Sequence, residues 1–247
     1  MEVTAITYFD GEQPLIGKLF RPDSERDQLP AVILFHAFEG IGEFTENYAK
    51  RIAEQGYVVL AADMYGNGET ADTIEGCFKL ITPFLNNREL VRRRALLAYE
   101  TLLKQKNIHL DKIGAMGFCF GGMCMLELAR SGAKLTAGVS AHGELAASTL
   151  PTHPINASLL VLHGYEDPQV PPTRLQAFAE EMKKANVADW MVVFFSHAKH
   201  SFTDPASGTY NPQKEQEMGR AYDPVAARRT FKYAIDFFEE KLQIRGV

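Results

Sequence analysis

The sequence predicts an α/β fold in which helices cover both faces of a mostly parallel central sheet, with an N-terminal antiparallel hairpin. Short apolar runs rich in β-branched residues alternate with segments of helical periodicity, which is the pattern of parallel sheets. An internal run such as residues 31–36 is apolar almost throughout, which is typical of strands buried on both faces. Residues 3–9 and 15–20, joined through Asp10 and Gly11, instead indicate a hairpin.

The elements after the hairpin follow in chain order. Ala31–His36 predicts a buried strand, and Glu43–Gln55 predicts a helix because Phe44 and Tyr48 recur on one face. Further strands are predicted at residues 57–62, 112–116, 135–141, 159–163 and 190–195. Further helices are predicted between the 63–68 loop and residue 106, from residue 119 onward, at residues 173–186, and after the Asp223-Pro224 pair. Residues 203–222 lack periodicity, and we interpret them as a long loop able to cap a site.

Composition and charge restrict the possible partners. The 247 residues are 46% hydrophobic and contain no linker or charge block, so we expect a single domain over residues 1–247. The net charge of −5 argues against a nucleic-acid partner, which requires a basic surface. One arginine cluster stands out, at residues 88, 92, 93 and 94. Since Val91, Ala95 and Ala98 recur at helical spacing beside it, we predict that it is the solvated face of an amphipathic helix.

Targeting, metal and cofactor signals are missing from the sequence. The start, Met1–Thr4, has neither a basic nor an apolar leader region, and no run of about 18 apolar residues occurs. We therefore expect a cytoplasmic protein with no membrane partner. Three cysteines without a C-x-x-C pair predict neither disulfides nor a zinc site. No cofactor is expected, because glycine motifs for dinucleotides or phosphates are missing.

The segment Gly117–Gly122 carries the strongest chemical signal. It lies between a predicted strand and a predicted helix and matches the nucleophile-elbow pattern G-x-S-x-G, with Cys119 in the serine position. Such a turn strains the backbone of the nucleophile and places its sulfur at a helix N-terminus, which favours the thiolate. The backbone N–H of Phe120 is then a natural oxyanion donor. The alternative is that Cys119 is a small core residue, as we expect for Cys124.

Two later loops supply an acid and a base. The strand at residues 159–163 leads to Glu166 and Asp167, and the last strand leads to His197 and His200. A carboxylate can orient a histidine and stabilise its cation. The chain order nucleophile, acid, histidine is that of α/β-hydrolases. A His-x-x-His pair alone does not indicate a metal site, because no other ligands accompany it.

These residues together resemble the dienelactone hydrolase family of α/β-hydrolases over nearly the whole chain. The resemblance rests on the elbow, on the segment Leu162–Pro168, on His200-Ser201-Phe202, and on the looser loop at residues 63–68. It implies a triad of Cys119, Asp167 and His200 in preference to Glu166 and His197. It also implies hydrolysis of a small ester or lactone through an acyl-thioenzyme, with the N–H of Phe38 as the second oxyanion donor.

Two positions differ from well-studied members of that family. A glutamate that engages their resting thiol is replaced by Ala37, and an arginine that follows their catalytic histidine is missing from Thr203–Pro205. These differences argue against dienelactone itself as the substrate. Side chains on neighbouring loops that we expect to contact the substrate are His36, Ala37, Glu39, Tyr65, His142 and Phe202. Two other functions use the same residues: acyl transfer to an alcohol or amine, and ligand binding without turnover.

Overall fold

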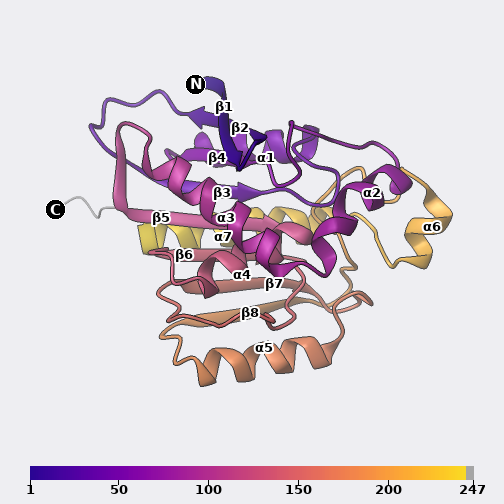
Figure 1. The fold of residues 1–247 in the computed structure, drawn as a ribbon. Helices are drawn as coiled ribbons and strands as arrows, with labels where there is room; N and C mark the ends of the chain where they lie inside the picture. The colour runs from indigo at the N-terminus through magenta and orange to yellow at the C-terminus, as the bar shows by residue number, and fades with distance from the viewer. Residues whose placement is uncertain (243–247) are drawn as a thin grey trace.

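The computed structural model describes residues 1–242, which form one eight-stranded sheet with the order β1-β2-β4-β3-β5-β6-β7-β8 (Figure 1). The strands are β1 (Glu2–Asp10), β2 (Gln13–Arg21), β3 (Leu29–Phe35), β4 (Val58–Ala62), β5 (Ile108–Phe118), β6 (Ala137–Ala141), β7 (Ser158–Gly164) and β8 (Trp190–Phe195). β1, β2 and β4 pair antiparallel, and β3 to β8 pair parallel. The predicted α/β-hydrolase fold, with its antiparallel start, is confirmed.

Helices cover both faces of this sheet. They are α1 (Glu43–Ala53), α2 (Ile74–Leu85), α3 (Arg88–Leu103), α4 (Phe120–Arg130), α5 (Pro172–Lys184), α6 (Pro212–Glu217) and α7 (Pro224–Leu242). One core cluster joins the sheet to α1 and α7, and the other joins it to α2, α3, α4 and α5. Side chains of β3 alternate between them, with Ile33 and Phe35 in one cluster and Val32 and Leu34 in the other. A strand buried on both faces must therefore be apolar throughout.

The helical region predicted up to residue 106 is two helices. α2 ends at Leu85. Asn87 is the N-cap of α3, and its side chain accepts a hydrogen bond from the backbone N–H of Leu90. Two adjacent asparagines, Asn86 and Asn87, thus interrupt a helical pattern that the apolar spacing alone makes continuous.

The arginines of α3 are not the solvated face that the sequence predicts. Val91, Ala95 and Ala98 are buried as expected. Arg94, however, is also buried and donates to the carbonyls of Met64 and Tyr65, besides pairing with Asp10. Arg92 and Arg88 pair with the buried carboxylate of Glu127, so the prediction was wrong for all but Arg93. Long arginine side chains reach partners beyond the helix face to which their Cα belongs.

Residues 203–222 form an ordered segment rather than a loop without structure. The segment contains α6, which begins after Asn211, whose side chain accepts from the N–H of Lys214. The Glu215 carboxylate is buried, accepts from the N–H of Tyr210 and pairs with the Arg220 guanidinium. Hydrogen bonds and ion pairs within the segment hold it in place, and hydrophobic periodicity does not reveal such pairs.

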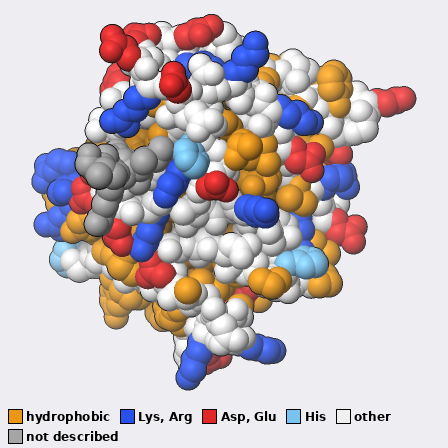
Figure 2. All heavy atoms as spheres, turned by 90° about the vertical axis from the view of Figure 1, so that its left-hand side faces the viewer, with side chains coloured by type: hydrophobic (Ala, Val, Ile, Leu, Met, Phe, Trp, Pro, Cys, Tyr) orange, Lys and Arg blue, Asp and Glu red, His pale blue; other side chains and the backbone are white. Residues whose placement is uncertain are grey.

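The carboxyl ends of the parallel strands lie on the right-hand side of Figure 1, where α2 and α6 are also found. The opposite face, turned toward the viewer in Figure 2, carries acidic and basic side chains interspersed over its surface. Within residues 1–242, no helix is both long and apolar enough to cross a membrane. Ligand sites of open parallel sheets lie at the carboxyl ends of the strands, so we expect the active site on the side of α2 and α6.

Candidate active site

The elbow between β5 and α4 holds Cys119 in a strained conformation. Its backbone has φ of 50°, a left-handed value that non-glycine residues rarely adopt. A Cβ atom on Gly117 would overlap the carbonyl of Gly121, and one on Gly121 would overlap the carbonyl of Phe35. Glycine is therefore required at both positions, and the backbone strain predicted from the motif is confirmed.

The loops after β7 and β8 bring two further side chains to the sulfur. The Nε2 atom of His200 lies 3.0 Å from the Sγ atom of Cys119, and its Nδ1 atom lies 2.8 Å from Oδ2 of Asp167. His200 and Asp167 are both buried. The backbone of His200 is bonded to Gly219 and Ala221, so the segment after β8 holds the imidazole in place. Glu166 and His197 are exposed, and their side chains pair with each other at 3.4 Å, away from Cys119.

Hydrogen bonds to Asp167 determine the tautomer of His200. Oδ1 of Asp167 accepts from the backbone N–H groups of Gln169 and Val170, which leaves Oδ2 for the imidazole. A carboxylate can only accept, so Nδ1 of His200 carries a proton. Nε2 then either accepts a proton from the Cys119 thiol or, once it has done so, donates to the thiolate.

Contacts among the three groups shift the pKa values of His200 and Asp167. Burial alone would lower the pKa of His200, but the Cys119 sulfur and the Asp167 carboxylate outweigh it and raise that pKa to about 9. Burial opposes ionisation of Asp167 as well, yet hydrogen bonds from His200 and from the Gln169 N–H hold its pKa below the usual range. At neutral pH the imidazole of His200 therefore retains its proton beside the Cys119 sulfur.

Two residues with unpaired backbone N–H groups line the cavity beside the sulfur. Phe120 is the first residue of α4, and Phe38 follows β3; both residues line the same cavity as Cys119. Neither N–H donates a hydrogen bond to another group within the described part of the chain. Both N–H groups are therefore available as donors, and their role toward an oxyanion stays a prediction from the sequence.

A buried network fixes the loop that carries Phe38. Nε2 of His36 accepts from the N–H of Met64, so Nδ1 must carry the proton that it donates to the carbonyl of Ala37. The Asp63 carboxylate accepts from four N–H groups, those of Ile16, Tyr65, Gly66 and Gly68. The Tyr65 hydroxyl donates to the carbonyl of Phe38. The loop at residues 63–68 thus supports the oxyanion-side loop from behind.

The six side chains predicted to contact substrate lie behind the cavity wall. These are His36, Ala37, Glu39, Tyr65, His142 and Phe202, all buried and none among the described residues that line the cavity with Cys119. His142 packs against the ring of His200, and Nε2 of His142 lies 2.7 Å from the Thr203 hydroxyl oxygen. Burial, followed by the neighbouring His200, lowers the pKa of His142 far below its usual value. Position on an adjacent loop predicted proximity correctly, but not the direction of these side chains.

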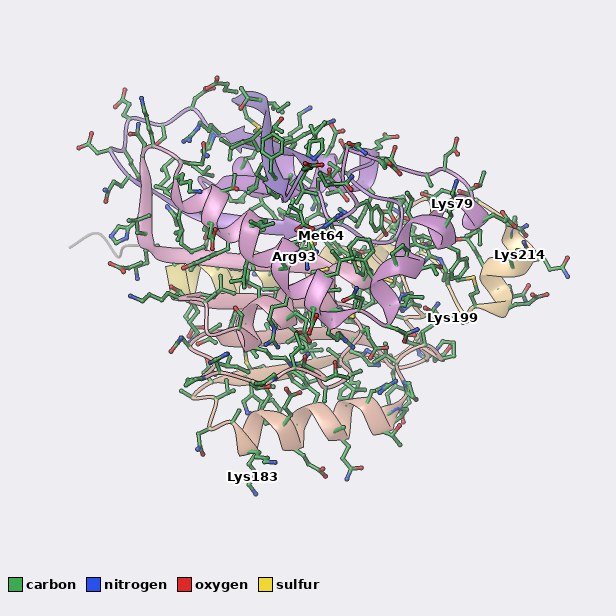
Figure 3. The ribbon with its side chains drawn as sticks, in the orientation of Figure 1. Met64, Lys79, Arg93, Lys183, Lys199 and Lys214 are labelled. Atoms are coloured by element: carbon green, nitrogen blue, oxygen red, sulfur yellow. The ribbon has the colours of Figure 1, made fainter. Side chains whose placement is uncertain are left out.

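A cavity of about 440 Å³ opens beside Cys119 and His200. Its other lining residues include Phe78, Ile81, Leu85, Met123, Val170 and Met218, together with the arginines Arg88, Arg174 and Arg220. Figure 3 shows Lys199, the chain neighbour of His200, on the same side of the molecule as Lys79 of α2 and Lys214 of α6. α2 and the 203–222 segment therefore supply much of the wall.

The sequence did not single out these three arginines as site residues. Arg220 lies with its guanidinium 4.2 Å from the centre of the Phe38 ring, and its segment forms a bridge to His200. Arg88 begins α3; its side chain is 10% exposed and its Nη1 atom donates no hydrogen bond within the described residues, although Glu127 lies 3.7 Å away. Arginine is thus present at the site, though not in the stretch directly after His200. No local motif marks these positions, since α3, α5 and the 203–222 segment each contribute one.

Comparison with known proteins agrees with this geometry. The model of the dienelactone hydrolase family matches residues 15–242. The crystal structure of a dienelactone hydrolase-like promiscuous phosphotriesterase from metagenomic libraries has a TM-score of 0.91 and 33% sequence identity, and the match covers 98% of this chain and 99% of the other.

Curated relatives agree as well. An uncharacterised protein of Caenorhabditis elegans is 36% identical over 133 residues, which is 53% of this chain and 80% of the relative. A putative carboxymethylenebutenolidase of Yersinia pestis is 24% identical over 212 residues, or 80% of this chain and 77% of the relative. The chain therefore belongs to the dienelactone hydrolase family and is an ester-bond hydrolase with the α/β-hydrolase fold.

Proposed function

We propose that the protein hydrolyses a small ester or lactone through an acyl-thioenzyme, with Cys119 as nucleophile, His200 as proton carrier and Asp167 as the group that orients it. The observation that carries the proposal is the chain of contacts from Sγ of Cys119 through both nitrogens of His200 to Asp167. Cys119 also lies at the N-terminus of α4. Helix N-termini and a protonated imidazole both stabilise a thiolate.

In the first half-reaction the Cys119 thiolate attacks the carbonyl carbon and a C–S bond forms. The oxygen that becomes negative is held by the N–H groups of Phe120 and Phe38. The tetrahedral intermediate then breaks its C–O bond, and the imidazolium of His200 donates its Nε2 proton to the leaving oxygen. The leaving group is an alcohol for an open ester; for a lactone, the new hydroxyl stays attached to the acyl chain.

In the second half-reaction His200, now neutral, takes a proton from water at Nε2. The hydroxide attacks the thioester carbonyl, the same N–H groups hold the oxyanion, and the C–S bond breaks to return the thiolate. The acid product leaves, and the thiolate-imidazolium pair is restored. Asp167 remains ionised throughout and stabilises each cationic form of His200.

The cavity supports a substrate class as well as a reaction. A volume of about 440 Å³ suits a small acyl compound, and its apolar lining suits the hydrocarbon part. On the same wall Arg174 pairs with Glu144 and Arg220 pairs with Glu215, whereas Nη1 of Arg88 donates no hydrogen bond within the described residues. Arg88 therefore favours a substrate that carries a negative group, such as a free carboxylate. One relative in Bradyrhizobium is named a probable 2-oxo-3-(5-oxofuran-2-ylidene)propanoate lactonase. The compound in that name, a propanoate, carries a free carboxylate. We therefore propose an anionic ester or lactone as the substrate.

A panel of p-nitrophenyl esters, thioesters and small lactones tests the proposal, with wild type beside Cys119→Ala and His200→Ala. Cys124→Ala is the matched control, because Cys124 is a buried thiol of the same helix. We expect turnover by wild type and by Cys124→Ala, and losses of several orders of magnitude in the other two. An inert but folded wild type, or full activity of Cys119→Ala, would contradict the proposal. Added methanol or glycine amide separates hydrolysis from acyl transfer through the products formed.

A further inference from the structure

A second cavity, of about 570 Å³, lies on the other side of the loop that follows β3. Phe38 lines the cavity with Cys119, whereas its chain neighbour Glu39 lines the second one. The second cavity is lined by Glu39, Gly42, Glu43, Phe44, Asn47, Thr70, Ala71, Asp72, Asp204, Pro205, Ala206 and Tyr210. It therefore shares no lining residue with the catalytic cavity, and nothing in the proposed reaction uses it.

Carboxylates are the charged groups of this cavity. Glu39 and Asp204 are each 5% exposed and form its inner part, while Glu43 and Asp72 are exposed at its rim. None of these four has an ion-pair partner within 4.0 Å in the part of the chain that the structure describes. The acids thus converge from the β3 loop, α1, the segment before α2 and the segment after His200.

Among the four carboxylates, Glu39 is the one whose unpaired oxygen indicates a ligand. Its Oε1 atom accepts no hydrogen bond from any described residue, although it is buried. A buried carboxylate oxygen without a donor is costly, and such groups are normally paired or protonated. The nearest guanidinium, that of Arg220, is engaged elsewhere, by Glu215, by the Ser207 hydroxyl and by the ring of Phe38.

The lining indicates what kind of cation would fit. Phe44 and Tyr210 offer aromatic surface beside the acids, and Asn47 and Thr70 offer further polar atoms. Aromatic surface next to carboxylates recognises organic ammonium groups through charge and cation–π attraction. No group of three His, Cys, Asp or Glu side chains within residues 1–242 is arranged to hold a metal ion. We propose that this cavity binds a small organic molecule bearing a primary ammonium group, with Glu39 and Asp204 as its acceptors.

Proton linkage gives the proposal a second signature. Burial, and then the charge of Asp204, raises the pKa of Glu39 to about 7, so that in the empty cavity the carboxyl is partly protonated at neutral pH. The titratable or charged groups that act on Glu39, or on which it acts, are Asp204, Arg220, Tyr65, Tyr210 and Cys77. An ammonium ion prefers the ionised carboxylate, so binding should release protons below about pH 7 and strengthen as pH rises through that value.

Isothermal titration calorimetry with n-butylammonium and 1,4-butanediammonium, each as the chloride, tests this site without reference to catalysis. We expect binding that n-butanol and calcium chloride do not reproduce. Glu39→Gln keeps the shape of the side chain and should weaken binding about 10-fold to 100-fold. Asp72→Asn, an exposed rim change that leaves the fold intact, should weaken it about twofold to fivefold. Glu180→Gln, an exposed carboxylate on α5, is the matched control and should bind as wild type does.

Heats of binding measured in two buffers of different ionisation enthalpy give the number of protons released. Equal binding of butanol would show an apolar pocket only, and binding of calcium in place of the amines would show a metal site; either result overturns the proposal. The proposal also fails if the amines bind Glu39→Gln and wild type equally while the melting curves of both proteins are cooperative. Failure of this test leaves the Cys119 chemistry untouched, because the two cavities have separate linings.

Discussion

Replacing Asp167 by asparagine should reverse the tautomer of His200. In the protein, Oδ1 of Asp167 accepts from the N–H groups of Gln169 and Val170, at 2.8 Å and 3.3 Å, and Oδ2 accepts from Nδ1 of His200. An asparagine at residue 167 keeps those two N–H groups satisfied only by pointing its carbonyl at them. Its NH₂ group then faces His200 and forces Nδ1 to accept, so the neutral ring carries its proton on Nε2, where it can take a proton neither from the thiol nor from the water of deacylation.

The energy of this effect follows from the two backbone donors. Rotating the amide to restore the productive tautomer would turn its NH₂ toward the N–H groups of Gln169 and Val170. A buried donor such as the N–H of Val170 costs about 1–3 kcal/mol when it is left without an acceptor, and the N–H of the exposed Gln169 costs less, so the productive form lies about 1–4 kcal/mol higher. At 1.36 kcal/mol for each factor of ten, kcat/KM should fall by roughly 5-fold to 10³-fold.

The assay is steady-state hydrolysis of p-nitrophenyl acetate at neutral pH by wild type, Asp167→Asn and Glu166→Gln. Glu166 is the adjacent, exposed carboxylate, so its loss should change kcat/KM by less than about twofold. Circular dichroism melts check that both variants fold. The reasoning is refuted if Asp167→Asn loses less than about threefold, or if Glu166→Gln loses as much as Asp167→Asn.

Three other outcomes follow from the same structure. The imidazole of His200 should titrate near pH 9 rather than near 6.5 when the histidine side chains are followed by ¹⁵N NMR, because the Cys119 sulfur and the Asp167 carboxylate raise its pKa; titration near 6.5 would contradict that account. Gly117→Ala should lower the free energy of unfolding in urea by more than about 3 kcal/mol, because the added Cβ would overlap the carbonyl of Gly121. Gly11→Ala, in open space at φ of 62°, should lower it by only about 1–2 kcal/mol, and equal losses would show that the elbow is not tightly packed. Arg88→Met should reduce kcat/KM for the p-nitrophenyl monoester of succinate about 10-fold or more, because the substrate carboxylate loses its cationic partner, and should change kcat/KM for the uncharged acetate ester little. Parallel losses for both esters would show that Arg88 does not recognise the substrate anion.

The fold, and the meeting of Cys119, Asp167 and His200 within it, were accessible from sequence because local rules determine them. Gly117 and Gly121 are required by backbone overlap within a few residues of Cys119, so the elbow is visible as a pattern. Parallel strands buried on both faces must be apolar, which makes the order of strands and helices legible. Chain order then places Asp167 and His200 after their strands.

The cavity wall could not be predicted in the same way. Arg88 and Arg220 are 132 positions apart in the numbering and line one cavity only because the fold brings the start of α3 and the 203–222 segment to the side of the sheet where Cys119 lies. The arginines of α3 looked like solvated charge because the partner of Arg88 and Arg92, Glu127, comes from another helix. Side-chain direction was equally hidden: Tyr65 and His142 lie on the expected loops but point into the protein.

The 203–222 segment illustrates a third limit. Its order comes from polar contacts, Glu215 with Arg220 and with the N–H of Tyr210, rather than from an apolar stripe. Pairings of this kind leave no period in the sequence. They determine where Asp204 and Tyr210 lie, and with them the second cavity.

Mass spectrometry of the intact protein, quenched in acid during the first turnovers of p-nitrophenyl acetate, tests the central claim most directly. We expect one acetyl group on wild type, located on Cys119 by peptide mapping, removable by hydroxylamine, and missing from Cys119→Ala. Turnover with no acetylated species, or an acetyl group on another residue that Cys119→Ala retains together with its activity, would contradict the acyl-thioenzyme.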